Sequence, residues 1–319
     1  MNDSNTTKNG IETESFYLTV HILNHYEVGA LHLLIVTFFI INQLLFFNSF
    51  YRLRRTLNTM PFKIIIHHGI VSFIAQICHF VTAIRTIINC LQPDITNRFT
   101  GSVINSTYIS GVALIFLLTL NRCDIMFNEQ LIPRLIRRKF YQYGIVACYI
   151  FACILCIFFS IPIYNLSFEG EYYEWVYDST EYYSQVAFQV QNTSVLTFLA
   201  LSTVLYVIMF LKLLQLRSYT TKKKVLEFTD IKFVIHALLC FASVAILEFS
   251  WSGILKNIYS NEITSLIPEL LFIFVSGCNT IVTFCFVKEI RNDVISFVSC
   301  GCKRNRKIKD LVKTNITKV

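Results

Sequence analysis

Residues 28–50 read VGALHLLIVTFFIINQLLFFNSF, an apolar stretch without Asp, Glu, Lys or Arg, and residues 51–63 follow it as YRLRRTLNTMPFK. A helix needs about 20 apolar residues to cross the hydrocarbon core of a bilayer. Lipid offers the backbone no hydrogen-bond partners, so the stretch is predicted to be a helix. The basic segment after it predicts that this helix ends at a membrane surface.

Six further apolar stretches follow, at 64–86, 102–121, 142–164, 193–214, 233–255 and 265–287. Basic residues gather in alternate gaps, with four in 51–63, five in 122–139, six in 212–232 and nine after 287, which is 24 of the 28 Lys and Arg. Loops with an excess of Lys and Arg stay cytoplasmic. The sequence therefore predicts an all-α bundle of seven transmembrane helices in the plasma membrane, with the N-terminus outside and the C-terminus inside.

The composition supports a membrane protein. Hydrophobic residues make up 54% of the chain and charged residues only 15%, whereas ordinary soluble domains have about 25% charged residues. We expect an extracellular tail at 1–27, a seven-helix domain with a juxtamembrane helix at 28–298, and a basic cytoplasmic tail at 299–319. The net charge of +8 arises from cytoplasmic flanks that face anionic lipid headgroups, and it does not indicate nucleic acid.

The segments outside the spans carry predicted modification sites. Asn2, Asn5 and Asn165 stand in Asn-x-Ser/Thr tripeptides on the predicted outer side. After the seventh span, apolar residues at 290, 294, 297 and 298 share one helical face, which predicts a short amphipathic helix along the inner leaflet. Cys300 and Cys302 follow it beside a basic run, as palmitoylation sites or as unmodified thiols.

The predicted loop 165–192 is acidic and aromatic. It contains no Lys or Arg, and its acidic residues are interleaved with Tyr and Trp. Aromatic side chains with a polar tip favour the membrane–water interface. The loop is therefore either an interfacial belt with a solvated acidic rim or a lid over a ligand entrance, and both interpretations stay open.

Polar residues inside the spans show which faces point inward, because ionisable groups in lipid are costly. On the second span six of them share one stripe at helical spacing: His68, Ser72, Gln76, His79, Thr82 and Thr86. The seventh span carries a second stripe, made of Glu269, Ser276, Thr280 and Thr283.

Three charges lie in the predicted outer half of the bundle: Arg85, Glu248 and Glu269. Our hypothesis is that Arg85 pairs with one of the two carboxylates beside a cavity that binds a ligand. Trp251 and Tyr108 would help to line that cavity. The alternative is a salt bridge that only fixes the helix register, or side chains that extend to the interface.

Signals of catalysis are absent from the sequence. No HExxH, P-loop, GxSxG or paired CxxC motif occurs. His67 and His68 are adjacent, so on a helix their side chains diverge by about 100° and do not favour a shared metal. We therefore predict no enzymatic activity, cofactor or metal.

The third span ends in Thr119-Leu120-Asn121-Arg122-Cys123, which resembles the Arg-bearing motif of rhodopsin-like G-protein-coupled receptors. The Leu-Asn-Arg form is similar to that of the nematode serpentine chemoreceptors. The end of the seventh span, from Asn279 through Thr283 to Phe286, is similar to the corresponding receptor pattern. The resemblance implies a chemosensory receptor that detects an external small molecule or peptide and activates a heterotrimeric G protein.

The resemblance also assigns roles to residues. Asn121, Arg122, Asn279 and Thr283 would form the activation switch. The G-protein contact would comprise Arg122 and basic residues of the inner loops: Arg137, Arg138, Lys222, Lys223 and Lys224. The alternative for these loops is basic charge that serves only to set the topology.

Some features depart from the receptor pattern. Asn121 stands where the family has an acid, so it cannot form an ion pair with Arg122. Thr280 and Thr283 replace a proline and a tyrosine. A small transporter or a ligand-gated channel subunit is the alternative class of protein. Transporters often contain internal repeats and helices broken by Gly or Pro. With 10 Gly, 5 Pro and no detectable repeat, the chain fits that class less well.

Overall fold

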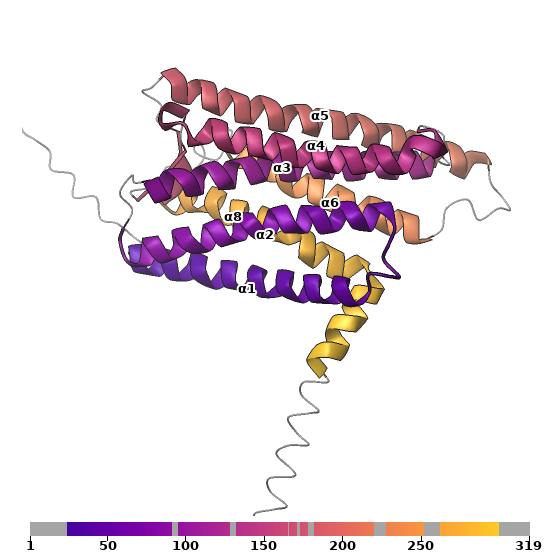
Figure 1. The fold of residues 1–319 in the computed structure, drawn as a ribbon, viewed down its shortest axis with the longest axis horizontal. Helices are drawn as coiled ribbons and strands as arrows, with labels where there is room; N and C mark the ends of the chain where they lie inside the picture. The colour runs from indigo at the N-terminus through magenta and orange to yellow at the C-terminus, as the bar shows by residue number, and fades with distance from the viewer. Residues whose placement is uncertain are drawn as a thin grey trace, which may run out of the picture.

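A computed structural model of the chain describes residues 24–90, 95–127, 132–164, 166–170, 173–177, 182–219, 228–251 and 262–299. Its main elements are seven long helices, drawn in Figure 1 as one bundle. They are α1 (His25–Arg52), α2 (Met60–Ile87), α3 (Ile95–Met126), α4 (Arg134–Ser160), α5 (Tyr182–Tyr219), α6 (Phe228–Trp251) and α8 (Glu262–Phe286). Each is long and apolar enough to cross a membrane, so the predicted seven-helix bundle is confirmed.

The bundle has two ends, which we name from the chain. The amino end is where α1 begins, and the carboxyl end is where α8 ends (Figure 1). Helix α1 begins in a capping box, in which the Asn24 side chain accepts a hydrogen bond from the Tyr26 backbone and the Glu27 carboxylate accepts one from the Asn24 backbone, both at 3.4 Å. Pro61 stands in the first turn of α2. Backbone N–H groups in a first turn have no partner within the helix, so proline, which lacks the N–H, costs no hydrogen bond there.

Helix α3 forms the centre of the bundle. It packs against α2, α4, α5 and α6, and 78% of its apolar membrane-spanning segment is buried inside the bundle. Small polar residues permit these close contacts, and the Ser110 hydroxyl donates to the Cys148 carbonyl of α4 at 3.2 Å. In contrast, only 17% of the apolar membrane-spanning segment is buried in each of α4 and α5, and α4 exposes a row of Ile side chains. These two helices therefore present broad apolar faces for lipid.

The polar stripes of α2 and α8 point inward, as predicted. All six residues of the α2 stripe are buried, as are Glu269, Thr280 and Thr283 of the α8 stripe. Gln76 on α2 donates to the Ile273 carbonyl at 2.7 Å and to the Ser276 hydroxyl at 2.6 Å, both on α8. The stripes thus supply hydrogen bonds between helices where lipid supplies none.

The region between α4 and α5 differs from the predicted loop. After a 3₁₀ turn, η1 (Pro162–Tyr164), strands β1 (Ser167–Glu169) and β2 (Glu174–Val176) pair antiparallel, with Phe168 opposite Trp175. Helix α5 then begins at Tyr182, eleven residues before the predicted span at 193. The first three turns of α5 are too polar to read as a span, and the hairpin is a local exception to the all-α prediction.

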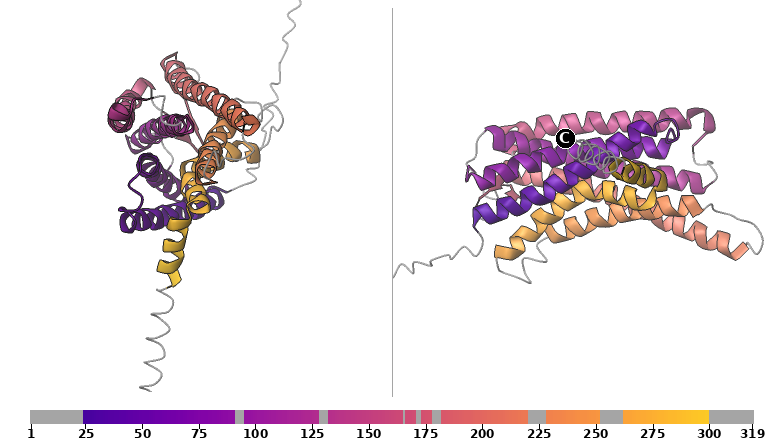
Figure 2. Two further views of the ribbon diagram at one scale, coloured as in Figure 1. Left: turned by 90° about the vertical axis from the view of Figure 1, so that its right-hand side faces the viewer. Right: turned by 90° about the horizontal axis from the view of Figure 1, so that it is seen from below.

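A short helix at 288–299 follows α8 and turns away from the bundle (Figures 1 and 2). Ile290 is fully buried, and its carbonyl accepts a hydrogen bond from the Ser49 hydroxyl of α1 at 3.4 Å. Arg52 forms an ion pair with Asp293 at 3.3 Å. Phe297 and Val298 are exposed. The predicted helix is confirmed, but its apolar residues divide between the bundle and the surroundings.

Candidate functional site

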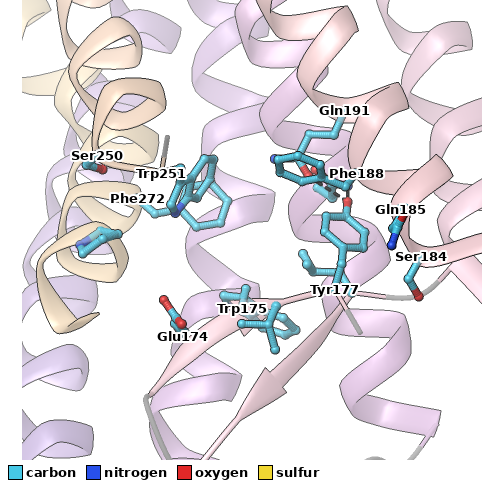
Figure 3. A pocket seen from close by; sticks show the side chains of 14 residues that line it. Glu174, Trp175, Tyr177, Ser184, Gln185, Phe188, Gln191, Ser250, Trp251 and Phe272 are labelled. Atoms are coloured by element: carbon cyan, nitrogen blue, oxygen red, sulfur yellow. Dashed lines mark hydrogen bonds between the residues drawn. The ribbon is translucent and has the colours of Figure 1, made fainter. Parts of the chain in front are cut away.

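A cavity of about 310 Å³ lies at the amino end, bounded by the β-hairpin, α3, α5, α6 and α8 (Figure 3). Five aromatic side chains line it: Trp175, Tyr177, Phe188, Trp251 and Phe272. Six polar side chains interrupt this apolar wall: Asn105, Glu174, Ser184, Gln185, Gln191 and Ser250. Binding sites for small molecules have this character, a mostly aromatic surface with a few placed polar groups.

The β-hairpin forms one wall of the cavity because it is attached to α3. Asn97 on α3 donates to the Phe168 carbonyl at 3.3 Å and accepts from the Phe168 backbone N–H at 3.1 Å. Gly101 lies one turn further along α3, and a Cβ there would collide with the Leu166 carbonyl oxygen. Glycine therefore permits the hairpin backbone to lie directly against the helix.

Tyr177 connects α3 to α5 inside the cavity. Its hydroxyl accepts a hydrogen bond from Asn105 Nδ2 at 2.5 Å and donates one to Gln191 Oε1 at 2.7 Å. Burial raises the pKa of Tyr177 above its ordinary value, although the Asn105 hydrogen bond acts in the opposite direction. The hydroxyl therefore stays protonated and can donate at any physiological pH. We name Asn105, Tyr177 and Gln191 the amide relay.

The aromatic floor of the cavity joins α3, α6 and α8. Trp251 and Phe272 lie with ring centroids 5.0 Å apart, and Tyr108 contacts Trp251 at 5.6 Å and Phe272 at 5.3 Å, all edge to face. Behind this floor, the Tyr108 hydroxyl donates to Glu248 Oε1 at 2.5 Å. Of the residues proposed from sequence to bind a ligand, Trp251 lines the cavity, whereas Tyr108 and Glu248 support its floor.

Arg85 and Glu269 have separate contacts in place of the predicted ion pair. Arg85 Nε donates to the Cys90 carbonyl at 3.0 Å, beyond the last turn of its own helix. Glu269 is buried on the side of α8 that faces α2, where its carboxylate lies 3.5 Å from His79 Nδ1. A cation near a helix C-terminus is stabilised by the unpaired carbonyls there, which explains the position of Arg85.

A second polar cluster lies at the carboxyl end and centres on Asp124. This carboxylate is fully buried and forms an ion pair with Arg137 of α4 at 2.7 Å. Its second oxygen accepts from the Ile132 backbone at 3.3 Å. Asp124 therefore attaches both α4 and the segment before it to α3. Asp124 stands two residues after Arg122 and is not among the site residues predicted from sequence.

Further polar contacts near this cluster join α3 to α5 and α6 to α8. Arg122 is buried, as is His236 of α6, whose Nε2 lies 3.0 Å from the Thr283 hydroxyl of α8. Thr119 contacts the Tyr206 hydroxyl of α5 at 3.2 Å. The four helices that bound the cavity at the amino end are thus joined in two pairs by polar contacts at the carboxyl end.

The structure also places the other residues with proposed roles. Asn121 and Asn279 are buried in the carboxyl-end half of the bundle, and Arg138 is exposed beside the Asp124–Arg137 pair. The remaining sites lie outside the described residues: Asn2, Asn5, Asn165, Lys222, Lys223, Lys224, Cys300 and Cys302. Within the described ranges, no group of three or more His, Cys, Asp or Glu could hold a metal ion.

Seven helices of spanning length make the chain a multi-pass membrane protein of the seven-transmembrane receptor class. The sequence profile of the family described as Serpentine type 7TM GPCR chemoreceptor Srt matches residues 18–307, which is most of the chain. The chain therefore belongs to the Srt family of serpentine chemoreceptors, a family of receptors and not of enzymes. A comparison with curated proteins gave no match.

Proposed function

We propose that the chain is a chemosensory receptor that binds an external ligand in the amino-end cavity and activates a heterotrimeric G protein at its carboxyl end. One observation carries this proposal. Helix α3 contributes Asn105 to the cavity and Arg122 and Asp124 to the carboxyl-end cluster. A single buried helix therefore connects the two sites through the thickness of the membrane.

The proposal requires the amino end to face outward and the carboxyl end to face the cytosol. The gathering of Lys and Arg at the carboxyl end supports this orientation. In the same orientation the tail 1–27, with Asn2 and Asn5, is glycosylated outside the cell. The tail 299–319, with Cys300 and Cys302, lies inside and is anchored by palmitoylation.

Coupling between the two sites requires an element with two arrangements that a ligand favours differently. We propose that the carboxyl-end cluster is this element. The Asp124–Arg137 pair holds α4 against α3, and the His236–Thr283 contact holds α6 against α8. A ligand that moves α6 at the cavity floor would strain the second contact. Its release would open the basic end of the bundle to the G protein.

Arg137 has a particular place in this mechanism. In the described conformation its guanidinium is engaged by Asp124 and only 15% exposed. Once released, it would join Arg122 and Arg138 in a cationic surface that suits an acidic partner, together with Lys222, Lys223 and Lys224 of the following basic segment.

Asp124→Asn tests the proposal in full-length receptor, reconstituted in nanodiscs with heterotrimeric G proteins and assayed for binding of a non-hydrolysable GTP analogue. Removing one partner of a buried ion pair costs about 3–5 kcal/mol. Even a third of that cost would shift the equilibrium about tenfold, since 1.4 kcal/mol is a factor of ten. We therefore expect ligand-independent nucleotide binding to rise about tenfold.

Arg55→Gln is the matched control, because Arg55 is an exposed arginine at the same end of the bundle. This variant should keep the wild-type rate. If Asp124→Asn receptor that remains folded promotes no more nucleotide binding than wild type with every Gα class, the proposed role of the cluster is wrong.

A further inference from the structure

We infer that the amino-end cavity recognises a compact, uncharged ring compound that carries a hydrogen-bond donor beside an acceptor, such as an aromatic carboxamide. This inference rests on the proposed function, in which the cavity is the ligand site. It names the chemical class of the ligand, and it follows from the amide relay, the charges in the wall and the size of the cavity.

The amide relay leaves one donor and one acceptor unused. Asn105 donates to the Tyr177 hydroxyl through Nδ2, so its Oδ1 remains available as an acceptor. Gln191 accepts from the Tyr177 hydroxyl through Oε1, so its Nε2 remains available as a donor. Neither remaining atom makes a hydrogen bond to a described residue, and neither is among the fully buried polar atoms that lack a partner. Both side chains line the cavity, so these two groups are available to a ligand.

This result does not depend on how the two amides are oriented. The Tyr177 hydroxyl has one proton, so it can donate to only one of its two amide neighbours and must accept from the other. If both amides were turned round, Asn105 would offer a donor and Gln191 an acceptor. In either arrangement the cavity presents a complementary donor and acceptor pair on neighbouring helices. A carboxamide matches this pair with its own carbonyl and N–H.

Charge in the cavity wall argues against an ionic ligand. Among the described residues that line the cavity there is no Lys or Arg, so an anion would lose its hydration without gaining a counter-charge from them. Glu174 is the single charged side chain among these described lining residues, and it already takes part in a contact within the protein. An ammonium ligand would need that one carboxylate as its counter-charge, whereas a neutral dipole would not.

The volume and the aromatic lining of the cavity favour a ligand that contains a ring. A volume of about 310 Å³ lies at the lower limit of ligand pockets, which span about 300–1,000 Å³. Trp251 and Phe272 lie toward α6 and α8 on one side of the cavity, and Phe188 lies toward α5 on the other (Figure 3). Aromatic surfaces of this kind stack on a ligand ring or meet its edge.

Four probes that share one ring test the inference: benzamide, acetophenone, benzylamine and benzoate. Binding to purified full-length receptor in nanodiscs is measured by ligand-observed NMR, which needs no signalling partner. We expect benzamide to bind about tenfold more tightly than acetophenone, because a lost hydrogen bond leaves a buried relay group unpaired. Benzylamine and benzoate should bind more weakly still.

Variants of Gln191 separate the relay from the general shape of the cavity. Gln191→Leu removes the donor to the probe carbonyl, which benzamide and acetophenone share, so both should bind about tenfold more weakly while benzamide keeps its preference through Asn105. Gln191→Glu replaces the donor with a carboxylate of the same shape and should make benzylamine the preferred probe. Tyr182→Phe is the control, because Tyr182 is 71% exposed and lies outside the cavity wall. It should keep the wild-type preference.

The inference is overturned if benzylamine or benzoate binds wild-type receptor as tightly as benzamide, or if none of the four probes binds. It is also overturned if Gln191→Glu leaves the order of affinities unchanged. Binding with the expected preference but without nucleotide exchange on any G protein would support the inference and contradict the proposed function. The two failures are therefore distinguishable.

Discussion

The two ends of the bundle use polar groups in opposite ways. Among the described residues that line the amino-end cavity, every polar side chain except Glu174 is uncharged, and the amide relay leaves a donor and an acceptor facing the cavity. At the carboxyl end charged groups are buried, and Asp124 uses both of its oxygens within the protein. Neutral hydrogen bonds contribute about 1 kcal/mol each, whereas breaking a buried ion pair costs several times more.

This difference suggests a division of labour. The carboxyl end sets the balance between two conformations, because its contacts are strong and made within the protein. A ligand at the amino end can shift that balance with a modest binding energy, because the free donor and acceptor of the amide relay can form hydrogen bonds with it. The predictions below alter one end at a time.

Gly101→Ala should have the largest effect at the amino end. Its Cβ would collide with the Leu166 carbonyl oxygen, so the hairpin must move away from α3 and the cavity wall must shift. We expect the affinity for benzamide to fall at least about tenfold, since a displaced relay loses one or more hydrogen bonds. Equilibrium binding to purified receptor measures this change.

Gly111→Ala is its matched control on the same helix. A Cβ at Gly111 would meet His68 Nε2 at 3.7 Å, an ordinary contact. Affinity should therefore stay within a factor of about two of the wild type, a change of less than 0.5 kcal/mol. Equal losses in the two variants would show that the hairpin contact has no special importance.

Thr283→Val should have an intermediate effect at the carboxyl end. It removes the hydroxyl beside His236 and leaves a buried imidazole without that contact, at a cost of about 1–3 kcal/mol. Thr280 is the comparison, because its buried hydroxyl has no hydrogen-bond partner among the described residues. Thr280→Val should be neutral or stabilising. Thermal unfolding in nanodiscs measures both, and a larger loss for Thr280→Val would contradict the structure.

The smallest effect concerns Arg85 and Glu269, one of the two ion pairs that the hypothesis from sequence allows. A double-mutant cycle of Arg85→Gln and Glu269→Gln should be additive within about 0.5 kcal/mol, because the two side chains have different contacts. The cycle of His79→Gln and Glu269→Gln should show coupling above that value. Thermal stability is the measurement. Coupling between Arg85 and Glu269 but none between His79 and Glu269 would restore the original pairing.

Much of the fold could be predicted because hydropathy and helical spacing can be read from consecutive residues of a single segment. The inward stripe from His68 to Thr86 follows from a fixed angle of about 100° per residue, and it is buried as predicted. Seven spans follow from the thickness of the bilayer. Such signals are local in sequence, so no knowledge of the neighbouring helices is needed.

The candidate site was harder to predict because it depends on contacts between distant segments. The first turns of α5 are polar, so the sequence predicts a loop there and does not place Gln191 on a helix. Asn105 and Tyr177 are 72 residues apart, and nothing in the sequence pairs them. Asp124 could have been noticed as an acid near the end of a span, but its partner Arg137 could not.

The most direct test of the account is the orientation of the two ends in the cell membrane. Cys90 is exposed at the amino end, and an epitope tag can be placed after Val319. On intact cells, a membrane-impermeant maleimide should label the wild type more than Cys90→Ser, and the tag should be detected only after permeabilisation. Detection of the tag on intact cells, or labelling of Cys90 only after permeabilisation, would contradict a receptor that binds outside and signals inside.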